Sequence, residues 1–287
     1  MFDFQTKFKR QIEILGLCGA EHVDCNNDYL LDEYNVEPLT IKRDLQELRS
    51  NGIDIHSSGK RGIEISKRLD SDKLKELLIQ YLGLCYSLNS YDKPVALMVK
   101  RLKDKALSNV VILQKCIEKR NMASIYYEKE DNEEERRWRD ICPLQMFQSE
   151  NFWRILAIHN GRIKQFHLNK ILDIKPLKQT FKPVPKKDID ELFMYSWKSW
   201  ISYDKYDVTL KLSKEWTEKI KPRQVMIYQD ITENEDGSFN LKITVNSLEE
   251  IASWIVSRGE GVTVLEPVEL KEKIINLAKG TLKNYNL

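Results

Sequence analysis

Hydrophobic and polar positions in the first 67 residues predict three helices followed by a β-hairpin. The segments 4–17, 28–34 and 39–49 have the pattern of helices, with apolar positions that recur on one side. The short stretches 53–55 and 63–65 alternate apolar and polar residues, as strands do. Three helices and a hairpin in this order predict a winged helix-turn-helix.

The third segment, Leu39–Arg49, has an apolar side and a polar side. Residues four and seven apart share one side of a helix. The two sets are Ile41, Leu45 and Leu48, which face a core, and Lys42, Gln46 and Arg49, which face outwards. The outward side chains can donate hydrogen bonds to phosphates or base edges. The pattern therefore predicts that this helix enters DNA, while Lys60 and Arg61 at the hairpin tip reach a phosphate or a minor groove.

Two helical segments, 69–88 and 94–119, follow the hairpin. Helices in this place either connect and dimerise a protein or belong to its core, and the sequence leaves both open. From Ala123 the pattern changes to short apolar or alternating runs. The predicted strands are 124–127, 138–143, 152–157, 163–167 and 171–172. Five short strands within about 60 residues predict a small barrel.

A second α/β region is predicted after the linker 181–185. It begins with a helix at 188–200 and continues with strands and helices in the order βαββαβα. The second strand is expected at 225–228. This order is typical of a ferredoxin-like α/β sandwich.

These elements predict a multidomain α+β protein with four parts. The parts are a winged helix-turn-helix at 1–67, a helical connector for dimerisation at 68–118, a small β-barrel that senses a ligand at 119–183, and a linker helix with a ferredoxin-like extension at 184–287.

The composition is that of a folded protein. The chain has 287 residues, of which 41% are hydrophobic and 31% are charged. No long run of apolar residues occurs, and Asp3, Lys7 and Lys9 lie where a signal peptide has its apolar core. We therefore expect no membrane segment and a cytoplasmic location.

The 5 cysteines are odd in number, scattered, and without a C-x-x-C pair. A disulfide framework is therefore not expected. Cys18, His22 and Cys25 lie close together in the sequence, but a metal site needs a further Cys or His pair at suitable spacing. We expect no metal and no cofactor.

Net charge alone does not indicate nucleic acid. The total is +2, and residues 1–67 contain 9 Lys and Arg against 12 Asp and Glu. A duplex is bound by cations gathered on one face, however, and not by the domain total. Residues 119–183 are more basic, with 13 Lys and Arg against 9 Asp and Glu. This second excess needs an explanation of its own.

The order of the parts and several motifs resemble the WYL-domain transcriptional regulators over nearly the whole chain. That family combines a DeoR-like winged helix, a Sm-like barrel and a C-terminal extension. Its V-S-x-x-T-I-x-R-D-L motif corresponds to residues 36–45, in which Thr40, Arg43 and Asp44 match and Glu37 replaces the serine. The resemblance implies that Arg43 contacts a phosphate. The residues expected to bind DNA are Thr40, Lys42, Arg43, Gln46, Arg49, Lys60 and Arg61.

The predicted barrel carries altered forms of the family motifs. The Trp-Tyr-Leu triplet corresponds to residues 153–155, the I-x-P-[YL] signature to 141–144 and the F-R-L-D-R-I element to 166–171. The resemblance implies that this barrel senses a nucleotide or single-stranded nucleic acid through basic residues. The residues expected to bind it are Arg139, Trp153, Arg154, His167 and Lys170. His167 replaces an arginine and is mostly uncharged at neutral pH, so Arg139 or Arg154 must supply the charge.

We therefore expect a ligand-responsive, sequence-specific regulator of transcription that acts as a repressor and binds a double-stranded DNA operator as a homodimer. The alternative is an interaction protein whose barrel binds a nucleotide or nucleic acid while the winged-helix module is vestigial. The acidic total of that module favours this alternative slightly.

An enzyme has the least support, and no catalytic residues are assigned. The chain lacks the G-x-x-x-x-G-K-[ST], H-E-x-x-H and G-x-S-x-G motifs. His159 and His167 share the barrel region with Asp140, but their spacing does not bring them into one cleft.

Overall fold

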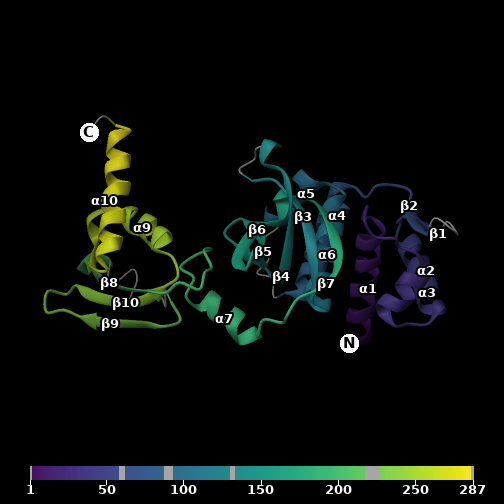
Figure 1. The fold of residues 1–287 in the computed structure, drawn as a ribbon, viewed down its shortest axis with the longest axis horizontal. Coiled ribbons are helices and arrows are strands. Elements are labelled where there is room, and N and C mark those ends of the chain that lie inside the picture. The colour runs from purple at the N-terminus through teal and green to yellow at the C-terminus, as the bar shows by residue number, and fades with distance from the viewer. Residues whose placement is uncertain (1, 58–61, 87–92, 130–132, 217–225, 286–287) are drawn as a thin grey trace. The chain divides into compact units, whose positions relative to one another are not determined.

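The computed structural model describes residues 2–57, 62–86, 93–129, 133–216 and 226–285. The chain forms two compact units, residues 1–183 and 184–287 (Figure 1). Each unit has its own hydrophobic core, and we describe the two units separately. Among the described residues, no helix is both long enough and apolar enough to span a membrane.

The first unit begins with α1 (Phe2–Cys18), α2 (Asn27–Tyr34) and α3 (Pro38–Ser50). The side chain of Asn26 caps α2 by accepting a hydrogen bond from the backbone N–H of Tyr29, and Pro38 occupies the first turn of α3. Strands β1 (Ile55–Ser57) and β2 (Ile63–Ile65) then pair antiparallel. The three helices and β2 lie where the hydrophobic pattern predicts them, whereas β1 begins two residues later than the predicted strand 53–55.

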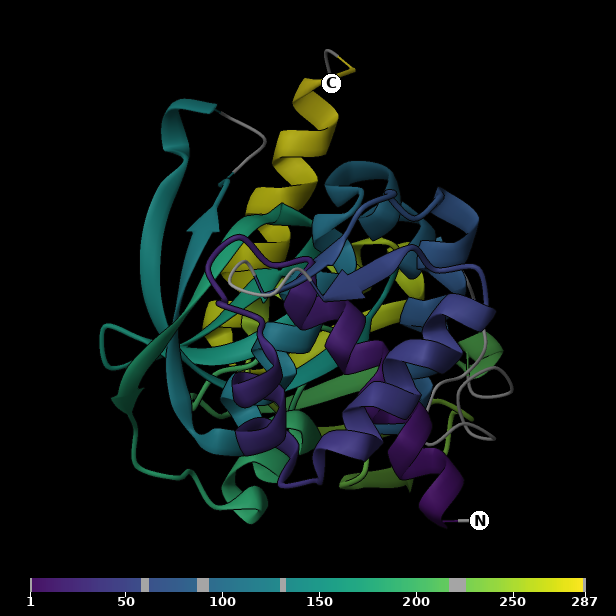
Figure 2. The ribbon, with the colours of Figure 1, turned by 90° about the vertical axis from the view of Figure 1, so that its right-hand side faces the viewer.

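Three helices follow: α4 (Ser71–Cys85), α5 (Lys93–Leu102) and α6 (Lys105–Lys119). The prediction of one helix over 94–119 is wrong, because Lys103 adopts a left-handed conformation (φ 52°) that separates α5 from α6. Helix α1 contacts α3 on one side and α4 and α6 on the other, as the views in Figures 1 and 2 show.

The sheet of the first unit has the antiparallel order β6-β5-β4-β3-β7. Its strands are β3 (Asn121–Tyr127), β4 (Arg137–Ser149), β5 (Phe152–His159), β6 (Arg162–His167) and β7 (Ile171–Thr180), with the short helices η2 (Glu133–Glu135) and η3 (Leu168–Lys170) between them. Helix α6 packs against β3, β4 and β7. One continuous core runs from α1 through α6 to this sheet, so the first three predicted parts share a single core.

The second unit contains α7 (Lys186–Met194) and a four-stranded antiparallel sheet of order β11-β8-β10-β9. Its elements are β8 (Tyr206–Leu212), β9 (Gln229–Glu233), β10 (Phe239–Val245), α9 (Leu248–Val256), η4 (Gly259–Gly261), β11 (Val262–Glu266) and α10 (Val268–Lys283). Helices α9 and α10 lie on one side of the sheet and cover its buried residues (Figure 1). The strand expected at 225–228 begins instead at Gln229.

Candidate nucleic-acid interface and barrel site

The outer face of α3 carries exposed polar side chains. Lys42, Arg43 and Gln46 are exposed and Thr40 is half-buried. Neither Lys42 nor Arg43 forms an ion pair with any residue that the structure describes. Their cationic groups are therefore available to an external anion such as a phosphate.

The opposite face of α3 is fixed to α1 by buried polar groups. The carboxylate of Asp44 is 1% exposed; it accepts a hydrogen bond from Arg10 Nε at 2.6 Å and another from Gln11 Nε2 at 3.2 Å. Glu47 receives hydrogen bonds from Lys7 and Gln11, which lower the pKa of its carboxyl. Charge-assisted hydrogen bonds of this kind orient α3 so that its other face points outwards. These α1 partners could not be predicted from local patterns, because they are separated from Asp44 by more than 30 positions.

The remaining predicted DNA contacts, Arg49, Lys60 and Arg61, do not belong to the exposed unpaired group on α3. Arg49 Nη1 donates to the backbone oxygen of Ile55 at 3.2 Å, so this side chain also ties α3 to β1. Lys60 and Arg61 at the wing tip lie outside the described residues.

Buried charges connect the N-terminal module to α6. Lys115 Nζ lies 2.7 Å from Glu13 of α1 and 3.6 Å from Glu33 of α2, and both carboxylates are almost completely buried. The hydroxyl of Tyr81 donates to Glu13 at 3.0 Å, and burial raises the pKa of that hydroxyl. Because α6 packs on the five-stranded sheet, these pairs form a direct physical link from the sheet to the helices beside α3.

Residues predicted to bind a ligand lie on two faces of the five-stranded sheet. Residues paired on adjacent strands point to the same face. Arg139 of β4 pairs with Ile125 of β3, and the pairing of β4 with β5 places Ala157 of β5 on the same face as Arg139. Arg154 pairs with His167 on the opposite face. The structure therefore brings Arg154 and His167 together but separates them from Arg139.

Arg139 lies against an aromatic side chain. Its guanidinium carbon is 5.8 Å from the centre of the Tyr127 ring, which in turn contacts Phe166 edge to face. The Arg139 Nε atom is buried and has no hydrogen-bond partner among the described residues. Asn169 Oδ1 is also buried without such a partner. A buried donor without an acceptor is unfavourable, so Arg139 is suited to gain an anionic partner.

The other predicted ligand residues have partners within the protein. Arg154 Nη1 donates to Gln165 Oε1 at 3.2 Å, and the His167 ring contacts Phe152 edge to face. Trp153 is 4% exposed and packs against Tyr86. Lys170 lies in η3, and its backbone oxygen accepts a hydrogen bond from the Glu128 N–H at 3.1 Å.

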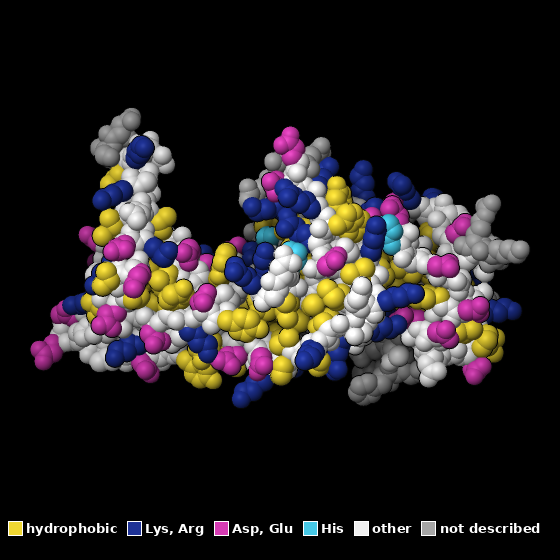
Figure 3. Space-filling model, viewed as in Figure 1, with side chains coloured by type: hydrophobic (Ala, Val, Ile, Leu, Met, Phe, Trp, Pro, Cys, Tyr) yellow, Lys and Arg dark blue, Asp and Glu magenta, His cyan; other side chains and the backbone are white. Residues whose placement is uncertain are grey.

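Sequence reasoning missed a buried carboxylate beside these residues. The Glu128 side chain is 4% exposed and is paired with two guanidiniums, those of Arg101 in α5 and Arg136. The Arg136 Nη2 atom lies 2.7 Å from Glu128 Oε1. On the face drawn in Figure 3, Lys and Arg side chains gather near histidine over the five-stranded sheet, with some Asp and Glu side chains among them.

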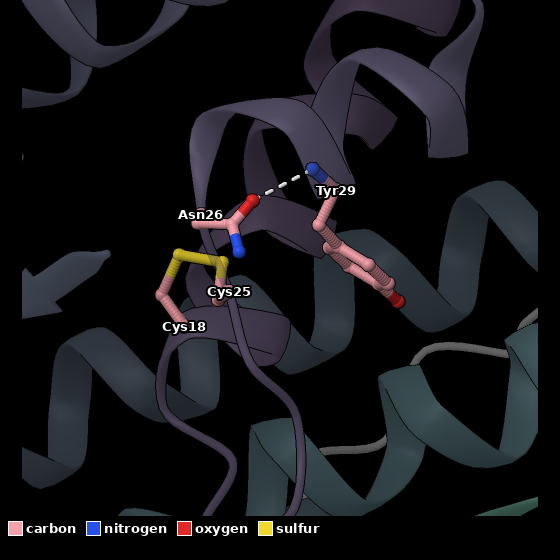
Figure 4. Close-up of a disulfide and its surroundings, with 4 residues drawn as sticks. All are labelled: Cys18, Cys25, Asn26 and Tyr29. Atoms are coloured by element: carbon pink, nitrogen blue, oxygen red, sulfur yellow. Dashed lines mark hydrogen bonds between the residues drawn. A yellow bond between two sulfur atoms is a disulfide. The ribbon is translucent and has the colours of Figure 1, made fainter. Parts of the chain in front are cut away.

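The expectation of unpaired cysteines is wrong for Cys18 and Cys25, which form a disulfide (Figure 4). Their Cα atoms are 5.1 Å apart, because the end of α1 and the residue before the α2 cap are adjacent in space. In the loop between them, Glu21 and His22 approach Asp173, and these three groups could hold a metal ion by geometry. Lys105 Nζ lies 3.0 Å from Glu21 and 3.8 Å from Asp173, so a cationic side chain already neutralises the cluster.

Comparison with family models finds two adjacent domains, a WYL domain at residues 108–176 and a WCX domain at residues 204–282. These matches include α6 with most of the first sheet, and the sheet and helices of the second unit. The chain belongs to the WYL-domain family.

Two solved structures show low similarity to the chain. Proteasome accessory factor B/C (PafBC) of Arthrobacter aurescens is 14% identical, with a TM-score of 0.30 over 99% of this chain and 49% of that one. A CRISPR Cas-related protein is 11% identical, with a TM-score of 0.38 over 99% of this chain and 86% of that one. The chain thus spans about half the length of the PafBC chain. At these identities and TM-scores, neither similarity indicates a function. A comparison with curated proteins gave no significant match.

Proposed function

We propose that this protein is a ligand-responsive, sequence-specific DNA-binding regulator of transcription that represses its target as a homodimer. The observation that carries the proposal is the outer face of α3, where Lys42, Arg43 and Gln46 are exposed while Asp44 anchors the opposite face to α1. A rigid helix with free cations beside a two-stranded hairpin is suited to a DNA groove. In a homodimer, two such helices would read half-sites of a double-stranded operator.

The fold is consistent with three specific modules. We assign α1 to β2 to a DeoR-like winged helix-turn-helix and β3 to β7 to a Sm-like barrel. The order β11-β8-β10-β9 with two helices on one side supports a ferredoxin-like extension.

The ligand is proposed to be an anionic nucleotide or a single-stranded nucleic acid that binds at the barrel. Arg139 provides a guanidinium whose Nε has no acceptor among the described residues, and Tyr127 provides an aromatic ring beside it. Such a pair can contact a phosphate and stack on a base. Lys115 and its buried carboxylates would transmit ligand binding to the N-terminal module.

The test is a titration of the full-length protein with duplex DNA from the region upstream of its own gene. We expect a saturable complex that resists an excess of unrelated duplex. Lys42→Ala or Gln46→Ala should change sequence preference, whereas Arg43→Ala should weaken binding to all duplexes. The absence of any complex with the wild-type protein would refute the proposal.

The second candidate is an interaction protein that binds a nucleotide or nucleic acid through the barrel alone. The acidic total of residues 1–67 favours it. Because the N-terminal module shares its core with α6 and the sheet, the two candidates should be separated in the full-length chain. Loss of binding in Arg139→Ala, with unchanged binding in Arg43→Ala, would support the second candidate.

We further propose that the protein is not an enzyme and that it acts in the cytoplasm. His159 Nδ1 lies 2.8 Å from the backbone oxygen of Asp140, so this ring contacts the main chain and not a catalytic partner. Incubating the protein with nucleotides and finding turnover would contradict this proposal.

A further inference from the structure

The disulfide between Cys18 and Cys25 closes the short loop that connects α1 to α2. We call this segment, residues 18–26, the joint. Cys18 is the last residue of α1, and Cys25 immediately precedes Asn26, which caps α2. The bond therefore fixes the end of one helix to the start of the next (Figure 4). A crosslink between these two points limits how far α1 and α2 can separate.

On one side, this joint is connected to the wing. The backbone oxygen of Cys25 accepts a hydrogen bond from the N–H of Ile63 at 2.7 Å, where β2 begins. Gly62 comes so close that a Cβ at this position would lie 2.5 Å from the Cys25 oxygen. A shift of Cys25 must therefore displace the start of β2, the strand that returns from the wing tip.

On the other side, the same loop contacts the barrel. His22 Nε2 lies 3.0 Å from Asp173 Oδ2 of β7, and the His22 ring contacts Trp138 of β4 edge to face. Glu21 is paired with Lys105 at the start of α6. The loop between the two cysteines thus touches both the wing and the proposed sensor sheet.

The two sulfur atoms differ in access to small reagents. Cys18 is half-buried and lines a cavity of about 310 Å³ together with polar residues such as Glu21, Arg68 and Lys105. Cys25 is 6% exposed. A small thiol can therefore reach Cys18 through the cavity more readily than it can reach Cys25.

We propose that Cys18 and Cys25 form a redox-responsive joint that changes DNA affinity according to whether the disulfide is formed. This rests on the proposed function, because a DNA-binding protein works where cellular reductants keep most thiols reduced and disulfides are usually transient. The disulfide holds α1, α2 and β2 in the arrangement described above, and this form is the one that binds DNA tightly. Reduction frees Cys25, loosens the start of β2 and weakens binding.

The exchange uses a low-molecular-weight thiol and its disulfide. The thiolate attacks Cys18 Sγ, the bond between the two cysteine sulfurs breaks, and Cys25 leaves as a thiolate that takes up a proton. A second thiol molecule then attacks the mixed disulfide, which releases Cys18 and the oxidised reagent. Two electrons pass from the two thiol molecules to the protein, and a low-molecular-weight disulfide reverses the reaction.

The test uses the full-length protein treated with dithiothreitol or with oxidised glutathione. Alkylation and mass spectrometry in denaturant should count five thiols in the reduced form and three, Cys85, Cys116 and Cys142, in the oxidised form. With duplex from the region upstream of the gene, the oxidised form should bind at least about fivefold tighter, the lower end of usual coupling. Cys18→Ser/Cys25→Ser should show the weaker affinity in both conditions, and the control Cys142→Ser should keep the difference.

Amide hydrogen exchange separates failure of this proposal from failure of the proposed function. Residues 19–26 and 62–65 should exchange more slowly in the oxidised form, whether or not DNA binds. If neither form binds DNA, the proposed function fails, and the exchange rates alone decide whether the joint responds to redox state. Equal exchange in both forms, or DNA affinities that are equal or higher in the reduced form, would overturn the proposal.

Discussion

Replacing Asp44 by asparagine tests whether the orientation of α3 depends on its link to α1. The substitution keeps the shape of the side chain but removes the charge that Arg10 contacts at 2.6 Å. Asp44 is 1% exposed and Arg10 is 13% exposed, so the guanidinium would remain largely buried without its carboxylate. Removing one partner of a buried pair costs about 3–5 kcal/mol. Because water still reaches part of Arg10, we expect a value near the lower end, about 3 kcal/mol.

Amide hydrogen exchange of peptides from α1 and α3 measures this loss of stability in the two helices themselves. A global unfolding experiment would be harder to interpret, because the two units can unfold separately. A loss of about 3 kcal/mol corresponds to roughly hundredfold faster exchange in these helices. The matched control is Asp72→Asn, because Asp72 pairs with Lys75 on an exposed surface and such pairs contribute little. Exchange in α3 that rises less than about fivefold in Asp44→Asn would refute the assignment of Asp44 as the anchor.

Three further predictions concern the same unit. The thermal midpoint of this unit should fall as the pH drops through the folded-state pKa of Glu47, because a carboxyl whose pKa is lowered on folding stabilises the fold fully only above its unfolded-state pKa. Calorimetry of Glu47→Gln should show a weaker pH dependence of the midpoint, and an unchanged pH dependence would contradict the Lys7 contact. Gly62→Ala should lower the free energy of unfolding more than Gly52→Ala, because both glycines have a positive φ but of these two only Gly62 has a backbone atom close to the added Cβ. Equal losses of unfolding free energy in denaturant titrations would count against that close approach. Nucleotides or short single strands should raise the melting temperature of the wild-type protein but not of Arg139→Ala, and a shift retained in the variant would move the ligand site elsewhere.

Local patterns predicted the elements that depend on local sequence. The apolar repeat of Ile41, Leu45 and Leu48 predicted the buried face of α3, and all three residues are buried. Helix α3 covers Pro38–Ser50, within one residue of the predicted segment 39–49 at each end. The family assignment made from the motifs is confirmed by the WYL and WCX matches.

Three features of the first unit could not be predicted from the hydrophobic pattern. The break at Lys103 is a single left-handed residue within an apolar helical pattern. The pairing of Cys18 with Cys25 follows from how α1 and α2 pack, and an odd cysteine count gives no information about one pair. The Glu128 cluster joins Arg101 of α5 to Glu128 and Arg136, which lie between β3 and β4, so only the folded chain brings their charges together.

The separation of Arg139 from Arg154 has a similar origin. Arg139 shares a face of β4 with Pro143, which pairs with Ala157 of β5, whereas Arg154 lies three positions from Ala157 and points to the other face. The family resemblance implied one ligand site containing both arginines. The predicted ligand residues therefore need the strand register before their positions can be assigned.

The salt dependence of DNA binding tests whether the outer face of α3 contacts the phosphates of a duplex. The affinity of the full-length protein for duplex from the region upstream of its gene would be measured at several salt concentrations, alongside Arg43→Ala and the control Lys271→Ala, an exposed lysine of α10. Each lost phosphate contact lowers the slope of log affinity against log salt by about 0.9. We expect a lower slope and weaker binding in Arg43→Ala and no change in Lys271→Ala. A salt-dependent complex whose slope and affinity are the same in all three proteins would contradict the account.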